Sequence, residues 1–389
     1  MLIKRIQLLL LAMICTLAAQ AQVANGYYRV KSSKQQRYIR ILDNRGSINL
    51  QTTDADMAAL CTQRSWDIVV SDPGSVIYVK KMTVGYDLQS QGTSSYAIIS
   101  HEVRAMDVGD GKYWCYASKG GMTKYLADEM YIEGFVSDEK YERGRLVTNI
   151  GPSDGEYLDW DLIPVSADGN YFGLAPTVSA GGSYYQTFYA AFPFTFLSEG
   201  MEAYYVDNIN ETTGKVHVKE ITGGVPASTP VIVKCSAQTP ASNKLDVGAS
   251  TSGSASGNQL TGVYFCNPNA GAAHTNVKEY DPTTMRVLGT ASDGSLAFVK
   301  DNSLQYIPAN TAYITVSASA PDVLLVTDQD TPAVPGDLNG DDQVTGQDLV
   351  IEANYILNDE YNEAADLNHD NKVTGQDYVI LVNKVLGIE

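Results

Sequence analysis

The chain has 389 residues, with 45 acidic and 27 basic side chains and a formal net charge of −18. This balance argues against a basic nucleic-acid-binding surface. No apolar stretch beyond the N-terminus approaches the ~20 residues of a transmembrane helix. The acidity is concentrated at one end, because residues 337–389 hold 12 acidic and 2 basic side chains, which is −10 of the total charge.

The first residues have the pattern of a secretory signal peptide. Lys4 and Arg5 precede an apolar run over residues 6–19, which is too short to span a membrane, and Ala19-Gln20-Ala21 is an A-x-A cleavage site. We therefore expect residues 1–21 to be removed and the protein to be secreted, either extracellular or at the cell surface.

Residues 22–166 consist of short runs rich in Tyr, Val and Ile, broken by Gly, Asp, Asn and Ser, which predicts a mostly β body. Three phrases of one kind open successive units: Tyr28-Arg29-Val30-Lys31, Tyr78-Val79-Lys80 and Tyr116-Ala117-Ser118-Lys119. Three phrases of a second kind stand near the ends of these units: Trp66-Asp67-Ile68, Met106-Asp107-Val108 and Trp160-Asp161-Leu162. Repeats of this period indicate one supersecondary unit per copy. Three such units resemble a β-trefoil of the ricin-B type, so we expect a β-trefoil-like domain over residues 22–166.

The ricin-B family often binds sugars, and its closing motif is Q-x-W. Here Gln63 stands three residues before Trp66 instead of two, and the other copies lack the glutamine. We expect Trp66 and Trp160 to be shared core, since large aromatic side chains dominate β cores. Trp114 is the candidate for an exposed aromatic side chain that contacts a glycan.

A second β module is expected over residues 183–328, after a Gly/Ser-rich boundary at 166–182. One phrase recurs in it, as Val225-Pro226-Ala227-Ser228-Thr229-Pro230-Val231 and as Ile307-Pro308-Ala309-Asn310-Thr311-Ala312-Tyr313. A turn leading into an apolar strand in this way resembles the β-sandwich accessory modules of secreted proteins from Gram-negative anaerobes. Residues 329–336 are expected to be a linker.

Four cysteines remain after cleavage: Cys61, Cys115, Cys235 and Cys266. Bridges Cys61–Cys115 and Cys235–Cys266 would each lie inside one proposed domain, and an exported protein can form them. The alternative is a set of small buried thiols. The sequence leaves both open.

The sequence offers no catalytic residue. Its body contains no GxSxG, P-loop, HExxH or GxGxxG motif in a suitable context. Asp159 and Asp161 flank Trp160, but this pattern also fits a strand with the tryptophan turned inward. A hydrolase acting on O-glycosyl compounds stays an alternative, because paired carboxylates meet in space and not along the chain.

The C-terminal end carries two copies of one unit, offset by 29 residues, as Asp337–Asp348 and Asp366–Asp377 show. Oxygen-bearing side chains stand at positions 1, 3, 5, 9 and 12 of each copy: Asp337, Asn339, Asp341, Thr345 and Asp348, then Asp366, Asn368, Asp370, Thr374 and Asp377. Position 7 would contribute the backbone carbonyl of Gln343 and of Lys372. This is the ligand spacing of a twelve-residue calcium loop, so we expect two calcium ions.

Each loop leads into apolar residues at helical spacing. These are Leu349, Val350, Ala353, Ile356 and Leu357 in one copy and Tyr378, Val379, Val382, Val385 and Leu386 in the other. We expect the two stripes to pack on each other. The entry to the first loop contains Pro332 and Pro335 and cannot be a helix interior.

A loop followed by a helix, twice and without an entering helix, resembles the dockerin type I module, an EF-hand-like calcium-binding domain, over residues 337–389. Position 6 departs from the family, which usually has glycine there, because it holds Asp342 and Asn371. The resemblance implies two near-equivalent faces for a cohesin domain, formed by Gly346, Gln347, Asn354, Gly375, Gln376 and Asn383.

These expectations combine into a mostly β, secreted, non-catalytic modular protein that a calcium-binding dockerin attaches to a cohesin-bearing extracellular assembly. Association with dockerins suggests polysaccharide binding or degradation, with glycans as further partners. Two alternatives stay open. One is a glycoside hydrolase or other hydrolase carrying the dockerin, and the other is a structural or adhesive surface protein.

Overall fold

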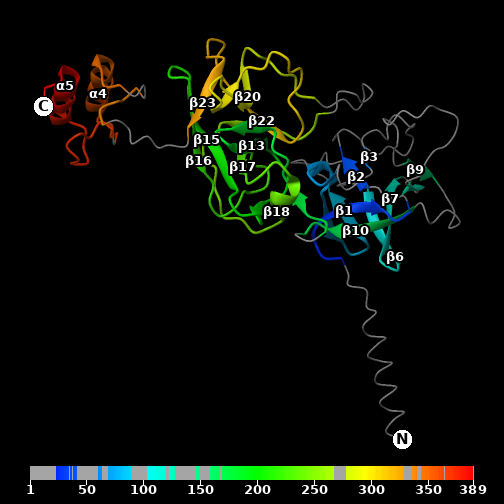
Figure 1. The fold of residues 1–389 in the computed structure, drawn as a ribbon. Coiled ribbons are helices and arrows are strands. Elements are labelled where there is room, and N and C mark those ends of the chain that lie inside the picture. Colours follow the sequence, from blue (N-terminus) through cyan, green and yellow to red (C-terminus); the bar gives the residue numbers. More distant parts are fainter. Residues whose placement is uncertain are drawn as a thin grey trace, which may run out of the picture.

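The computed structural model describes residues 23–34, 36, 38–41, 60–63, 69–89, 103–119, 122–127, 145–148, 158–166, 169–266, 277–327, 335–339, 343–362 and 364–388. They form a mostly β structure followed by two C-terminal helices (Figure 1). The predicted signal peptide, Trp66 and Asp341 lie outside these residues. Within them, no helix has the length and apolar character needed to cross a membrane.

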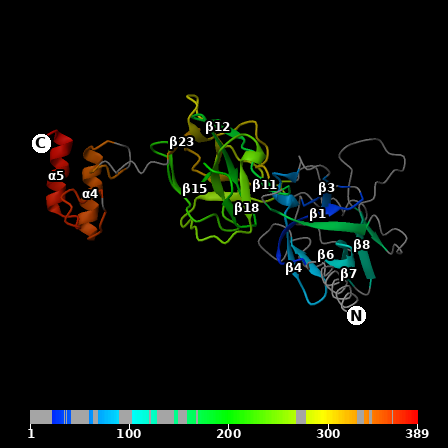
Figure 2. The ribbon, with the colours of Figure 1, turned by 60° about the horizontal axis from the view of Figure 1, so that its bottom comes forward.

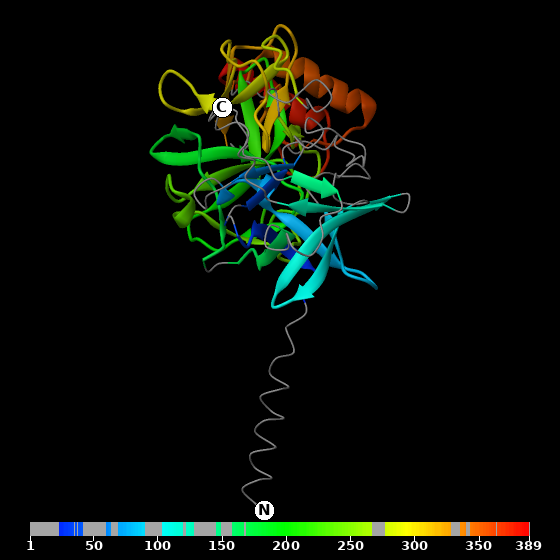
Figure 3. The ribbon, with the colours of Figure 1, turned by 90° about the vertical axis from the view of Figure 1, so that its right-hand side faces the viewer.

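The first β region contains ten described strands. They are β1 (Gly26–Ser32), β2 (Tyr38–Ile41), β3 (Leu60–Gln63), β4 (Ile77–Lys81), β5 (Tyr86–Gln89), β6 (Val103–Gly109), β7 (Lys112–Lys119), β8 (Met122–Ala127), β9 (Arg145–Thr148) and β10 (Asp159–Pro164). Six of them pair antiparallel in a closed ring, in the order β1, β4, β5, β6, β7, β10 and back to β1. The pair β2–β3 extends from β1, and β8–β9 extends from β7. The β6–β7 hairpin is the long cyan pair in Figure 3.

Alternate residues of the ring strands point inward and form its core. Val30, Val79, Leu88 and Cys115 are among the buried members, and Trp160 is fully buried with them. The core position expected for Trp160 is therefore confirmed. Asp159 and Asp161, on either side of it in β10, face outward and are half-buried.

The second β region contains thirteen described strands. They are β11 (Phe172–Gly173), β12 (Val178–Ala180), β13 (Ser183–Phe188), β14 (Phe194–Phe196), β15 (Glu202–Asn210), β16 (Lys215–Glu220), β17 (Val231–Cys235), β18 (Lys244–Val247), β19 (Leu260–Val263), β20 (Met285–Thr290), β21 (Leu296–Val299), β22 (Thr311–Thr315) and β23 (Val323–Thr327). Ten of them form one sheet in the order β12-β13-β17-β15-β16-β23-β21-β20-β22-β19, and β11-β18-β14 form a second. Only the β16–β23 pairing among these is parallel.

The segment 166–182, expected to be a boundary, contributes to this second region. β12 pairs with β13, and Phe172 is buried in the same core as Phe188. Gly181 and Gly182 form the tight turn between β12 and β13, with φ of 56° and 79°, whereas Gly173 and Ser179 lie within β11 and β12.

The repeated phrase of the second region forms the same turn twice, as predicted. Ser228 and Asn310 occupy equivalent places and both adopt left-handed backbone conformations, with φ of 60° and 57°. Each turn leads into an apolar strand, β17 in the first case and β22 in the second.

Cys115, Cys235 and Cys266 are free thiols, so neither of the two bridges that the sequence left open is formed. Cys115 and Cys235 are buried core side chains, in agreement with the alternative interpretation. Burial raises the pKa of each of these two thiols to about 12.

The C-terminal helices α4 (Gly346–Asn358) and α5 (Gly375–Leu386) lie side by side, as Figures 1 and 2 both show. The predicted apolar stripes are only partly correct. Val350 and Leu357 are 64% and 81% exposed, and Val379 and Leu386 are 57% and 64% exposed. The fully buried positions are instead Asp348, Glu352, Asp377 and Leu381. Hydrogen bonds hold the side chains of Asp348 and Asp377 inward. The buried face of each helix is therefore the face that carries its aspartate.

Candidate metal centre

The second loop, Asp366–Asp377, folds its backbone around its own side chains. The two carboxylate oxygens of Asp366 accept hydrogen bonds from the backbone N–H groups of Asp370 at 3.0 Å and Asn371 at 2.8 Å. Asp370 in turn accepts one from the backbone N–H of Lys372 at 3.0 Å. Asn371 takes the left-handed conformation at position 6, with φ of 64°. An asparagine tolerates this conformation well, so the departure from glycine leaves the turn intact.

The last loop residue links each loop to its helix, and it does so in the same way in both copies. Asp348 accepts backbone hydrogen bonds from Asn339 at 3.1 Å and Thr345 at 2.8 Å. Asp377 accepts the equivalent bonds from Asn368 at 3.1 Å and Thr374 at 2.9 Å. The two threonines are N-cap residues of α4 and α5, and each forms a complete capping box with the aspartate.

These contacts also set the charge of the two aspartates. Burial alone would raise the pKa of Asp348, but hydrogen bonds from the backbone of Thr345, Leu338 and Asn339 outweigh burial and lower it. The pKa of Asp377 is lowered for the same reason. Both side chains are therefore carboxylates at neutral pH, the form that binds a metal ion.

The predicted ligands of the second loop are all in the described part of the chain, whereas the first loop lacks Asp341 there. Among the described residues, no three acidic, histidine or cysteine side chains converge closely enough to hold a metal by themselves. The donors of both loops are all oxygen atoms of carboxylates, amides, hydroxyls and backbone carbonyls, which fits a hard cation such as calcium.

The six residues expected to form docking faces are all exposed: Gly346, Gln347, Asn354, Gly375, Gln376 and Asn383. Each glutamine also contacts its loop, because Asn339 Nδ2 donates to Gln347 Oε1 at 3.1 Å and Asn368 Nδ2 donates to Gln376 Oε1 at 3.4 Å. The loop and the docking positions are thus joined by side-chain contacts in both copies.

Four apolar residues that the sequence interpretation placed in the packed stripes are exposed instead. Val350 and Leu357 on α4 are exposed, and so are Val379 and Leu386, which stand 29 residues later on α5. On each helix, these two residues extend the row of exposed positions that begins next to the loop. The signal was present, because exposed apolar residues that recur with the repeat indicate two equivalent surfaces.

Comparison with family models agrees with this geometry. Residues 335–386 match the dockerin type I domain. Dockerin type I domains bind calcium, and their partners are cohesin domains. No curated protein matches the chain.

In the first β region, Trp114 is half-buried and its indole N–H donates to Asp159 Oδ1 at 2.8 Å. The neighbouring Lys112 Nζ lies 2.5 Å from Asp161 Oδ1. Both aspartates that flank Trp160 are therefore paired with side chains of β7. This pairing disfavours their use as a catalytic acid and base.

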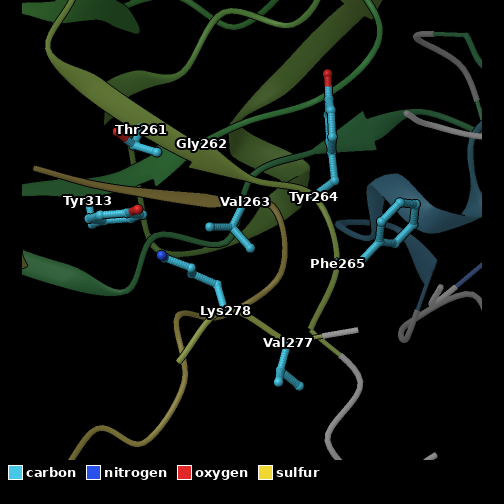
Figure 4. Close-up of a pocket in the computed structure, with 8 residues that line it drawn as sticks. All are labelled: Thr261, Gly262, Val263, Tyr264, Phe265, Val277, Lys278 and Tyr313. Atoms are coloured by element: carbon cyan, nitrogen blue, oxygen red, sulfur yellow. The ribbon is translucent and has the colours of Figure 1, made fainter. Parts of the chain in front are cut away.

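A hollow of about 380 Å³ lies beside the edge strand β19 in the second β region (Figure 4). It is lined by Thr261, Gly262, Val263, Tyr264, Phe265, Val277, Lys278 and Tyr313. The Tyr264 ring stacks on Tyr189 with 4.1 Å between centroids, and Lys278 Nζ lies 5.9 Å from the centroid of the Tyr313 ring. Its described lining contains no acidic, histidine or cysteine side chain.

Proposed function

We propose that this chain is a secreted, non-catalytic modular protein that docks onto a cohesin-bearing extracellular assembly through residues 337–389, in the binding or breakdown of polysaccharide. The observation that carries the proposal is the duplicated loop–helix unit. In both copies, position 12 accepts the same backbone hydrogen bonds and caps the same helix. The family match over residues 335–386 supports it.

Each loop is proposed to hold one calcium ion. The ligands are the side chains at positions 1, 3, 5, 9 and 12 and the carbonyls of Gln343 and Lys372, with position 9 acting through water. Bound calcium, with its two positive charges, would offset most of the negative charge of the three ligand carboxylates in each loop. The aspartates at position 12 also cap α4 and α5, so calcium bound in a loop would act directly on the start of the helix that carries the docking positions.

Two equivalent docking faces follow from the repeat. One consists of Gly346, Gln347, Val350, Asn354 and Leu357. The other consists of Gly375, Gln376, Val379, Asn383 and Leu386. Exposed apolar side chains bordered by polar ones are typical of protein–protein contacts. Each face lies entirely on one helix and is complete without the other face.

The test is binding of the full chain to a panel of immobilised cohesin domains, with calcium or with a chelator. Val350→Asp with Leu357→Asp removes one face, and Val379→Asp with Leu386→Asp removes the other. We expect either pair to leave binding within about twofold, because the other face remains, and all four changes to abolish it. Val84→Asp is the matched control, since Val84 is a 69% exposed apolar side chain in the first β region. Undiminished calcium-dependent binding by the fourfold variant would contradict the proposed faces.

For the body we propose a β-trefoil-like domain over residues 22–166 and a sandwich-like accessory module after it. The closed ring of six strands, with β2–β3 and β8–β9 outside it, supports the trefoil. Trp114 is the proposed glycan contact, since its half-exposed ring lies beside Lys112 and Asp159, which offer polar groups to a sugar. Trp114→Ala should then abolish retardation of the chain in polysaccharide-containing gels. Equal retardation of variant and wild type would count against this role.

A further inference from the structure

Glu352 is a buried acid without a partner. It lies on α4 with a fully buried side chain, and neither carboxylate oxygen has a hydrogen-bond partner in the described structure. Burying a carboxyl group without hydrogen bonds costs several kcal/mol in general. Such a group between two helices therefore calls for a specific reason.

The repeat shows which loop Glu352 faces. Its equivalent, 29 residues later, is Leu381, which is also fully buried. A Cβ added to Gly336, just before the first loop, would lie 2.5 Å from Leu381 Cδ1. Leu381 thus lies beneath the start of the first loop. If the repeat keeps this relation, Glu352 on the other helix is the residue beneath the start of the second loop, where the equivalent of Gly336 is the buried Ala365.

Electrostatics agree with this placement. Burial raises the pKa of Glu352 to about 7, and the nearby Asp377 carboxylate adds to the increase. Asp377 is the closing residue of the second loop. The buried acid therefore interacts with the second loop, although it belongs to the helix that follows the first.

We propose that Glu352 supplies a fourth carboxylate to the second calcium site, so that the two sites of this chain are unequal. The inference rests on the proposed calcium binding by the loops. Asp366, Asp370 and Asp377 give the second site three carboxylates of its own. The first site also has three, but the position beneath it is occupied by Leu381. Because calcium takes six to eight oxygen ligands and its affinity follows their charge, we expect the second site to bind more tightly.

The test uses the full chain with one loop inactivated at a time and calcium chloride as the titrant. Asp337→Ala leaves only the second site, and Asp366→Ala leaves only the first. Glu352→Leu places in α4 the residue that α5 already has, so it fits the packing. In the Asp337→Ala background we expect it to raise the calorimetric Kd of the second site at least tenfold. In the Asp366→Ala background the Kd of the first site should stay within about twofold.

Glu352→Gln keeps the size and polarity of the side chain and removes its charge, and we expect it to weaken the second site selectively as well. Unchanged or tighter binding at the second site in both Glu352 variants would overturn the proposal. Equal weakening of both sites would also overturn it, since that result shows an effect on the shared fold. A wild-type chain that takes up no calcium would instead overturn the proposed function on which the inference rests.

Discussion

The buried guanidinium of Arg29 joins the two β regions at the scale of single residues. Arg29 lies on β1 and is fully buried. It donates to Ser75 Oγ at 3.1 Å, to the backbone oxygens of Val69 and Val70, and to Asn170 Oδ1 at 3.0 Å. Burial lowers the pKa of Arg29 to about 10, so the side chain is still charged at neutral pH. Its partners come from segments far apart in the chain.

Arg29→Met should destabilise the protein strongly. The change leaves several buried carbonyl groups without donors, and each such group costs about 1–3 kcal/mol. We expect a loss of roughly 3–5 kcal/mol in the free energy of unfolding, measured by urea denaturation. Arg104→Met, at an exposed position of β6, is the control and should stay within about 0.5 kcal/mol. Equal stability of the two variants would contradict the role assigned to Arg29.

The reactivity of the free cysteines gives a second prediction at the scale of single residues. Because burial raises the pKa of Cys115 and Cys235 to about 12, both remain protonated thiols at pH 8, and the thiolate is the reactive form. In the native protein, iodoacetamide should label the half-buried Cys266 and leave these two unlabelled. All three should react in urea, as mapped by mass spectrometry. A Cys235–Cys266 disulfide in the purified protein would contradict the structure.

At the scale of elements, the loop–helix unit was largely predictable because its information is local. The spacing of oxygen-bearing residues and the Thr-x-x-Asp capping pattern lie within twelve consecutive residues. The buried face of the helices was harder to predict. Val350 and Val379 were expected to pack inward, but Asp348 and Asp377 are held inside by loop N–H groups that apolar periodicity does not reveal. Glu352 escaped notice because an acidic residue normally marks an exposed position.

Gly336 should be essential to the packing of this unit. Its φ of 98° is strained for any residue with a side chain, and a Cβ there would lie 2.5 Å from Leu381 Cδ1. Gly336→Ala should therefore cost about 1–3 kcal/mol, seen as a lower midpoint for thermal loss of the helical dichroism signal in calcium. Gly375→Ala is the matched control, since a Cβ there would meet nothing within 4 Å. If both variants melt with the wild type, the packing beneath the first loop is not as described.

At the scale of the whole molecule, the sequence indicated a mostly β body with a C-terminal calcium module but not how the strands close. The ring depends on pairings such as β1 with β10, which join opposite ends of the first region. No local pattern specifies such contacts. The same holds for the link between Arg29 and Asn170, which are 141 residues apart in the chain. Turn chemistry proved more predictable, since one repeated phrase produced the turns at Ser228 and Asn310.

The most direct test of the central claim is a calorimetric titration of calcium into the full chain, followed by the Asp337→Ala and Asp366→Ala variants. The account predicts two ions for the wild type, one for each single variant and none for the double variant. Far-ultraviolet dichroism should show a gain of helix only where calcium binds, since metal binding by such loops is coupled to folding. No saturable heat, or heat that persists in the double variant, would show that the C-terminal repeats are not calcium sites and would remove the basis for docking.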